Sequence, residues 1–326
     1  MIKDRLYWID WTKFFLIYLM VIGHIGNPQY PNSLLHDWLY TFHMGAFFIV
    51  SGFLYKKSTI VNDFKSLFIP VLWISLISLS YRACFMYYIL DYPFNWMHYI
   101  VYPIAGFFVF PTSGFSVDPF TGLWYIEVLF ILRLFFHVCN GSVFRMTTIM
   151  LMSVLYILLE SNRGADFIRH LLVERSLFCI PLFYVGYLIK QKNISIQIRS
   201  WLLFALAIIC FCCSYLSGNI DIYSSEYGNH LIYFYITPIL YFILMYNIFV
   251  RIGKKYYSSF IYYSSLGTIL ILGLHSMCHS IISHLLKFVH LNLPSVLEGL
   301  LILLILYVPI RFLFNNYPVL LGKIKK

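Results

Sequence analysis

The sequence predicts an all-α fold, a polytopic transmembrane bundle of about ten helices with both termini in the cytoplasm. Two properties of the chain predict this fold: its composition and the length of its apolar runs. Of its 326 residues, 61% are apolar and only 11% are charged, and the mean hydropathy is +0.78. A soluble domain carries roughly 25% charged residues, so this chain has too little polar surface to cover a core. The apolar runs are about 17–25 residues long and rich in Leu, Ile and Phe, which favours helical spans over barrel strands.

Apolar runs bounded by breaking residues indicate ten candidate spans. They cover residues 9–26, 37–55, 66–90, 121–138, 146–160, 174–190, 200–217, 230–250, 259–283 and 296–315. A shorter apolar piece near 97–110 ends at Pro111 and is predicted to be a partial or re-entrant helix. No internal repeat is visible and the loops are too short for a second domain, so residues 1–326 are predicted to form one transmembrane domain.

The lysines and arginines predict the orientation of these spans. Most of them fall on one set of alternating span ends: Lys3, Arg5, Lys56, Lys57, Lys65, Arg145, Lys190, Lys192, Arg199, Arg251, Lys254, Lys255, Arg311, Lys323, Lys325 and Lys326. The opposite set of ends holds Arg163, Arg169, Arg175 and Lys287. Cytoplasmic loops carry the excess of Lys and Arg, so the first set and both termini are predicted to be cytoplasmic.

The net charge of +10 is therefore a topology signal. Nucleic-acid binding explains it poorly, because the basic residues are spread over short cytoplasmic segments. The seven cysteines lie within or at the ends of apolar runs, and no pair of them has a zinc or redox spacing. We therefore expect free thiols and no metal site.

Five ionisable side chains, each from a different span, share the outer half of the membrane in this orientation. They are His24, His43, Arg82, Glu127 and His275. At about 1.5 Å per helical residue, His43 lies roughly 9 Å below the outer end of its span. A lone histidine on a helix is often only a hydrogen-bonded core residue. Five ionisable groups at one depth favour a functional site, because each must find polar partners away from lipid.

A second polar group is predicted at the cytoplasmic side. Asp10 and Lys13 lie at the inner end of the first span, and Arg133 lies in the inner half of the fourth. Two interpretations stay open here. Lys13 is a snorkelling lysine beside a helix-start carboxylate, or it is a cationic contact for an anionic cytoplasmic ligand that Arg133 shares.

Several short patterns resemble the integral-membrane acyltransferase 3 family, which includes bacterial sugar and polysaccharide O-acetyltransferases. The patterns are Arg5-Leu-Tyr-Trp-Ile-Asp10-Trp-Thr-Lys13 followed by Gly23-His24, then Phe42-His43-Met44 through Ser51-Gly52, Gly122-Leu123-Trp124-Tyr125, and Ser264-Ser265-Leu266 through Leu272 and His275. They occur in the family's order and on the expected spans. The residues before His275 and the position of Glu127 depart from the family, and the chain is similar to its stand-alone members.

The resemblance implies transfer of an acetyl group from cytoplasmic acetyl-CoA to a hydroxyl of a surface sugar or glycan, in the inner membrane of a bacterium. His24 is expected to act as the general base or the acyl-accepting nucleophile, since neutral imidazole accepts a proton near neutral pH. The expected site residues are catalytic His24, His43, Arg82 and Glu127, donor-binding Lys13, Asp10 and Arg133, and acceptor-binding Trp124 and His275. Arg82 and Glu127 are the best available charge partners.

Two other classes of protein fit the same composition. A carrier for a lipid-linked sugar also needs embedded charges and broken helices, although most carriers show an internal repeat that is not visible here. A structural scaffold would not need five ionisable groups at one depth. The identity of the sugar, the acyl group and the oligomeric state are left open by the sequence.

Overall fold

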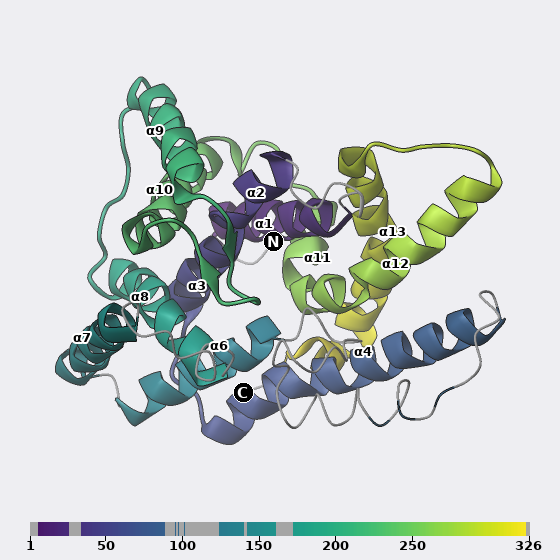
Figure 1. Cartoon of the computed structure of the whole chain (residues 1–326), viewed down its shortest axis with the longest axis horizontal. Coiled ribbons are helices and arrows are strands. Elements are labelled where there is room, and N and C mark those ends of the chain that lie inside the picture. Colours follow the sequence, from purple (N-terminus) through teal and green to yellow (C-terminus); the bar gives the residue numbers. More distant parts are fainter. Residues whose placement is uncertain are drawn as a thin grey trace.

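The chain is described by a computed structural model over residues 6–25, 34–88, 124–139, 142–160 and 172–323, together with residues 95, 97 and 101. The described part is a helical bundle (Figure 1). Its elements are α1 (Tyr7–Ile25), α2 (Leu34–Tyr40), α3 (His43–Leu54), α4 (Ile60–Tyr88), α6 (Trp124–Val138), α7 (Val143–Glu160), α8 (Leu172–Gln191), α9 (Leu202–Ser217), β1 (Ile220–Asp221), β2 (Glu226–Tyr227), α10 (Leu231–Ile252), α11 (Ser259–Leu266), α12 (Thr268–Phe288), α13 (Ser295–Asn316) and the 3-10 helix η4 (Pro318–Leu321).

Among the described residues, 5 helices are long and apolar enough to cross a membrane. They are α1, the first part of α4, α10, α12 and α13. The segments Val143–Tyr156 and Leu202–Ser217 form shorter apolar helices. The coarse prediction of a helical membrane protein agrees with these elements. The full set of ten spans and the placement of the termini stay predictions.

Two of the predicted spans are interrupted, which corrects the expectation of continuous helices there. The second span divides into α2 and α3 at Thr41 and Phe42, directly before His43. Thr41 Oγ1 donates to the Trp38 carbonyl at 2.7 Å and Phe42 has a non-helical φ of −139°, so this turn has its own hydrogen bonds. The ninth span divides into α11 and α12 at Gly267.

Helix α3 lies in the middle of the bundle, in contact with α1, α8 and α10. Its approach to α8 is close enough to require glycine on both helices. A Cβ on Gly52 would lie 1.8 Å from the Phe183 carbonyl oxygen, and one on Gly186 would lie 1.9 Å from the Ile49 carbonyl oxygen. Small residues let helix backbones approach closely in membrane proteins. This close contact packs the second half of α3 directly against α8.

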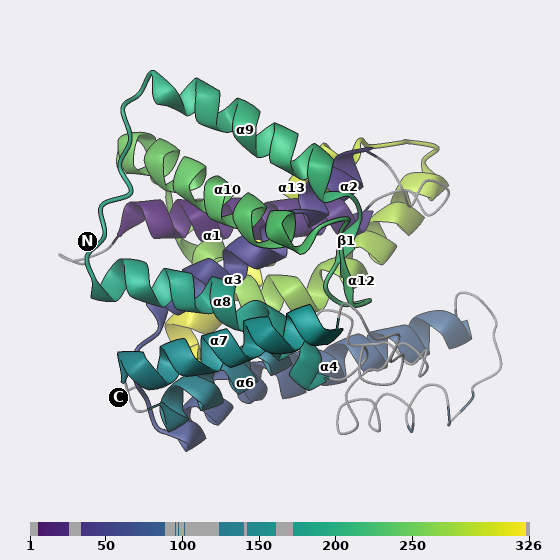
Figure 2. The ribbon, with the colours of Figure 1, turned by 60° about the vertical axis from the view of Figure 1, so that its left-hand side comes forward.

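The segment between α9 and α10 carries a short antiparallel hairpin, which the all-α prediction did not include. Strands β1 and β2 pair with Ile220 opposite Tyr227 and Asp221 opposite Glu226. Figure 2 shows β1 beside α2 at one end of the bundle, while α1 begins at the opposite end. We call these the hairpin end and the opposite end.

Some predictions fall on parts of the chain that the structure does not describe. The apolar piece near 97–110 lies outside the described residues apart from residues 97 and 101. Arg82 belongs to α4, but its side chain lies outside the described part, as do Arg163 and Arg169.

Candidate active site

Three residues predicted from the sequence as site residues meet in one cavity at the hairpin end. This space, the histidine cavity, has a volume of about 110 Å³. His24 comes from the last turn of α1, His43 is the first residue of α3, and Trp124 is the first residue of α6. The rest of the wall is formed by Met20, Tyr40, Met44, Ile220, Asp221, Ile222, Tyr223 and Leu272.

The hydrogen bonds of the histidines select the same ring tautomer in each. Nδ1 of His24 lies 2.8 Å from the Met20 carbonyl oxygen, and Nδ1 of His43 lies 2.7 Å from the Leu39 carbonyl oxygen. Nδ1 of His275 lies 2.8 Å from the Leu272 carbonyl oxygen. A carbonyl oxygen only accepts, so Nδ1–H is the donor in each bond. In the neutral rings, Nε2 is therefore the atom with a lone pair that can accept a proton.

His275 does not line the cavity itself, but it packs against His24. The centroids of the two rings are 4.9 Å apart at an interplanar angle of 79°. His275 and His43 are buried, whereas the His24 side chain is exposed to the cavity. Among the described residues, Nε2 of His275 is buried with no hydrogen-bond partner. Of the two histidines that line the cavity, His24 is thus the more exposed one, and His275 packs against it.

The ring of Tyr40 packs near both histidines that line the cavity. Its ring centroid lies 6.2 Å from that of His24 and 5.0 Å from that of His43. Tyr40 is the last residue of α2, so the break at residues 41–42 lets Tyr40 and His43 present their rings to the same space. A continuous helix through this segment would give these side chains a different relative placement.

Glu127 lies one turn beyond Trp124 and is buried, but it is not among the residues that line the histidine cavity. Its Oε2 has no hydrogen-bond partner in the described part of the chain. The cation that acts on it is Arg175, in the first turn of α8. The Arg175 guanidinium lies 5.1 Å from the centroid of the Tyr223 ring. Arg175 therefore lies against the cavity wall at Tyr223, and the expected pairing of Glu127 with Arg82 stays a prediction because the Arg82 side chain lies outside the described part.

A second cavity, of about 210 Å³, adjoins the first and contains the predicted basic residues. We call it the basic cavity. Lys13, Arg133 and Lys323 line it, together with the polar side chains of Ser51, Tyr125 and Thr268. Lys13 lies in the first half of α1 and Lys323 is the last described residue. The cavity therefore lies where these two segments, far apart in the sequence, come together.

Hydrogen bonds fix two of the basic side chains in place. Lys13 Nζ donates to the Ser265 carbonyl oxygen, two residues before the break at Gly267. Arg133 Nη1 donates to Asp63 Oδ1 at 3.0 Å, so this cation has a carboxylate neighbour. Lys13 and Arg133 thus line one cavity, with Arg133 partly neutralised by Asp63.

Asp10 has a structural connection that the sequence did not reveal. Its carboxylate accepts hydrogen bonds from Tyr257 Oη at 2.5 Å and from Ser265 Oγ at 2.7 Å. These bonds join α1 to α11 and to Tyr257, two residues before α11, and they lie beside the bond between Lys13 and Ser265. Asp10 is not among the residues that line the basic cavity. Asp10 therefore holds α1, the helix that carries Lys13, against α11.

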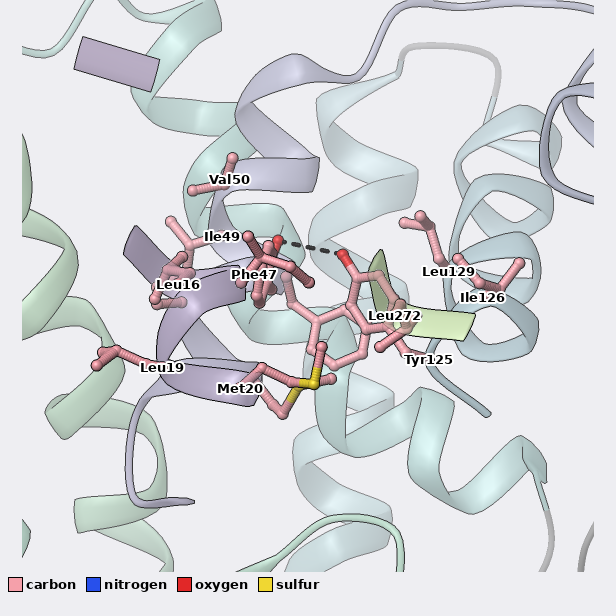
Figure 3. Packing of buried hydrophobic residues seen from close by; sticks show 14 of the residues in the cluster. Leu16, Leu19, Met20, Phe47, Ile49, Val50, Tyr125, Ile126, Leu129 and Leu272 are labelled. Carbon is pink, nitrogen blue, oxygen red and sulfur yellow. Dashed lines mark hydrogen bonds between the residues drawn. The ribbon is translucent and has the colours of Figure 1, made fainter. Parts of the chain in front are cut away.

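The two cavities share three apolar side chains: Met20, Met44 and Leu272. We call this set the collar. Figure 3 shows Met20 and Leu272 close to Phe47 and to Tyr125, whose hydroxyl donates to the Phe47 carbonyl oxygen at 3.5 Å. Within the described part of the chain, the collar residues are the ones that line both cavities, and they lie between the basic space and the histidine-lined space.

Several lining residues escaped the sequence analysis. Tyr40, Asp221 and Tyr223 line the histidine cavity, and Lys323 lines the basic one. Asp221 is held by a turn in which Oδ1 accepts from the Tyr223 N–H at 3.0 Å. The two-residue strands leave no alternation signal in the sequence, so only the folded hairpin brings these side chains to the site.

No family model, curated protein or solved structure matches this chain. The fold and the two cavities are those of a helical membrane protein with polar side chains in its interior.

Proposed function

We propose that the chain is a membrane-bound O-acyltransferase that moves an acetyl group from cytoplasmic acetyl-CoA to a hydroxyl of a surface sugar or polysaccharide. The observation that carries the proposal is the pair of adjoining cavities, one basic and one lined by histidines, that meet at the collar. Such a layout suits a donor that enters from one side of the membrane and an acceptor that enters from the other. The proposal includes ten spans with both termini in the cytoplasm, which makes the hairpin end the outer end.

The basic cavity is the donor side in this proposal. Coenzyme A carries several phosphate charges, and cationic side chains attract and hydrogen-bond such groups. Lys13 and Lys323 supply ammonium groups, while Arg133 contributes less net charge because of Asp63. The pantetheine arm is long and thin, so it can pass the collar and present the thioester to His24.

The histidine cavity is the acceptor side. His24 Nε2 takes the proton of the acceptor hydroxyl while the hydroxyl oxygen attacks the thioester carbonyl carbon. The carbon–sulfur bond then breaks, and the departing thiolate takes the proton from His24. The bond from His24 Nδ1 to the Met20 carbonyl keeps Nε2 available for this exchange. A route through an acetyl-His24 intermediate uses the same nitrogen as the nucleophile.

The neighbouring groups have supporting roles in this scheme. His43 orients the acceptor or His24, and His275 packs behind His24. Trp124 forms part of the acceptor wall. Arg82 stays the proposed stabiliser of the oxyanion, and Arg175 lies against Tyr223 of that wall.

Substitution of His24 tests the proposal. His24→Ala should lower acetyl transfer at least about a hundredfold, since general-base catalysis contributes roughly 10²–10⁴-fold. The measurement is release of CoA thiol from acetyl-CoA by the protein in nanodiscs, together with mass spectrometry of acetylated surface glycan from cells that express it. His284→Ala is the matched control, because His284 is exposed on the same helix as His275. Normal acetylation by well-folded His24→Ala protein would remove His24 from the mechanism.

A carrier for a lipid-linked sugar is the second candidate, and the breaks at Thr41–Phe42 and Gly267 favour it. Discontinuous helices commonly form the binding sites of carriers. The two candidates differ in one measurement. Membranes that contain an acyltransferase exchange or hydrolyse labelled acetyl-CoA, whereas a carrier leaves the thioester intact.

A further inference from the structure

A third cavity, of about 360 Å³, lies at the far end of α3 from His43 and shares no lining residue with the other two cavities. Its volume falls within the roughly 300–1,000 Å³ range of small-molecule sites. The residues that line it are Tyr55, Lys56, Lys57, Phe136, Met146, Tyr187, Lys190 and Gln191. We call it the lysine cavity. None of these eight described residues carries a carboxylate.

Three lysines line this cavity because two helices end side by side. The close contact of Gly52 with α8 brings the end of α3 against the last turn of α8. Lys56 and Lys57 follow α3 directly, and Lys190 lies in the last turn of α8. The charges of Lys56 and Lys190 act on each other. A lysine at the end of one helix compensates the helix dipole, but that explains each residue singly and not their convergence on one space.

Aromatic rings form the rest of the wall and are packed against one another. The ring centroids of Tyr55 and Phe136 are 5.5 Å apart, those of Phe136 and Tyr187 are 5.4 Å apart, and those of Tyr55 and Tyr187 are 6.1 Å apart. Rings held in this way lose little freedom when a ligand binds, so the wall is preorganised. The cavity therefore combines a cluster of positive charge with a rigid, partly apolar surface.

We propose that the lysine cavity binds the phosphate groups of an organic phosphate. Ammonium groups form charge-assisted hydrogen bonds to phosphate oxygens, and a bound anion relieves the mutual repulsion of Lys56 and Lys190. Two sources carry this chemistry. One is the phosphorylated adenosine end of the donor, which rests on the proposed acetyl transfer. The other is an anionic phospholipid headgroup, because basic pockets between helices at the cytoplasmic side bind such headgroups independently of any reaction.

The test uses the full chain in phosphatidylcholine nanodiscs and two probes. Adenosine 3′,5′-bisphosphate is titrated by calorimetry, and phosphatidylglycerol retention is measured by native mass spectrometry. The wild-type protein should bind one of the probes saturably. The double variant Lys56→Gln, Lys190→Gln should bind it at least about tenfold more weakly, since charged hydrogen bonds are lost. Lys192→Gln is the matched control, because Lys192 is exposed just beyond α8 and does not line the cavity.

The outcomes separate the sources and decide the proposal. Loss of the nucleotide alone assigns the cavity to the donor, and loss of the lipid alone assigns it to a headgroup. Binding of neither probe by the wild-type protein overturns the proposal, as does equal weakening by Lys192→Gln. If the double variant does not fold, the single variants replace it, and two folded single variants that both bind like the wild type also overturn it. Neither probe carries a thioester, so these results are independent of acetyl transfer.

Discussion

Leu272 is the collar residue whose substitution tests most directly whether the two cavities communicate. It projects from α12 into both cavities and is 9% exposed. Leu272→Trp places a larger side chain between spaces of about 110 and 210 Å³. The proposed reaction requires the donor arm to pass this point. The indole should therefore impede transfer without touching Lys13 or His24.

The size of the effect follows from the cost of moving an overpacked side chain. Extra bulk in a packed interior costs about 1–3 kcal/mol. If the donor arm must displace the indole, that cost is added to the barrier, and transfer slows by roughly 5- to 150-fold. Donor affinity at the basic cavity should change much less, because Lys13 and Lys323 are unaltered.

The assay measures the two quantities separately for each variant in nanodiscs: acetyl-CoA binding by calorimetry, and CoA release in the presence of acceptor glycan. Leu272→Met keeps a similar volume and should behave like the wild type. Leu285→Trp puts the same indole on the exposed side of α12, where Leu285 is 60% exposed, and should have little effect. Wild-type turnover by folded Leu272→Trp would refute the collar as a passage. Equal impairment by Leu285→Trp would show that the indole acts through the helix rather than through the collar.

Three further predictions concern donor binding, packing and orientation. Lys13→Ala should weaken acetyl-CoA binding by about 1–3 kcal/mol, since a charge-assisted contact is lost, and calorimetry with an unchanged dissociation constant would contradict the donor role. Gly186→Ala should destabilise the protein by about 1–3 kcal/mol in thermal unfolding, because the added Cβ lies 1.9 Å from the Ile49 carbonyl oxygen and forces α3 from α8. An impermeant maleimide should label Ser224→Cys but not Lys323→Cys in intact cells, and labelling of Lys323→Cys would reverse the proposed orientation.

Much of the fold could be predicted because membrane helices leave a strong signal in the sequence. Long apolar runs mark helices such as α1 and α13 within a few residues of their observed bounds, since lipid demands that each backbone group bond within its own helix. The interruptions escaped prediction. Thr41 is weakly polar and Phe42 is apolar, so neither marks a break in the sequence. Their turn also bonds to a distant helix, since Thr41 Oγ1 donates to Ser214 Oγ of α9.

The candidate site was predictable only in part for a related reason. His24 and His43 were predicted to lie at one depth and Trp124 to bind the acceptor, and the structure brings all three to one cavity. Depth alone does not tell which side of a helix a residue faces. Glu127 is therefore buried without lining the cavity, although it lies one turn from Trp124.

The sequence by itself determined that this chain is a helical membrane protein with ionisable groups in its interior, because composition and run length follow directly from the solvent that the helices face. Only the tertiary structure decided which of those groups share a space. The hairpin residue Asp221, the collar residue Leu272 and the lysine cavity beside Lys190 all arise where segments distant in the sequence pack together. Such contacts depend on helix rotation and close approach, and the hydrophobic pattern of a single span specifies neither.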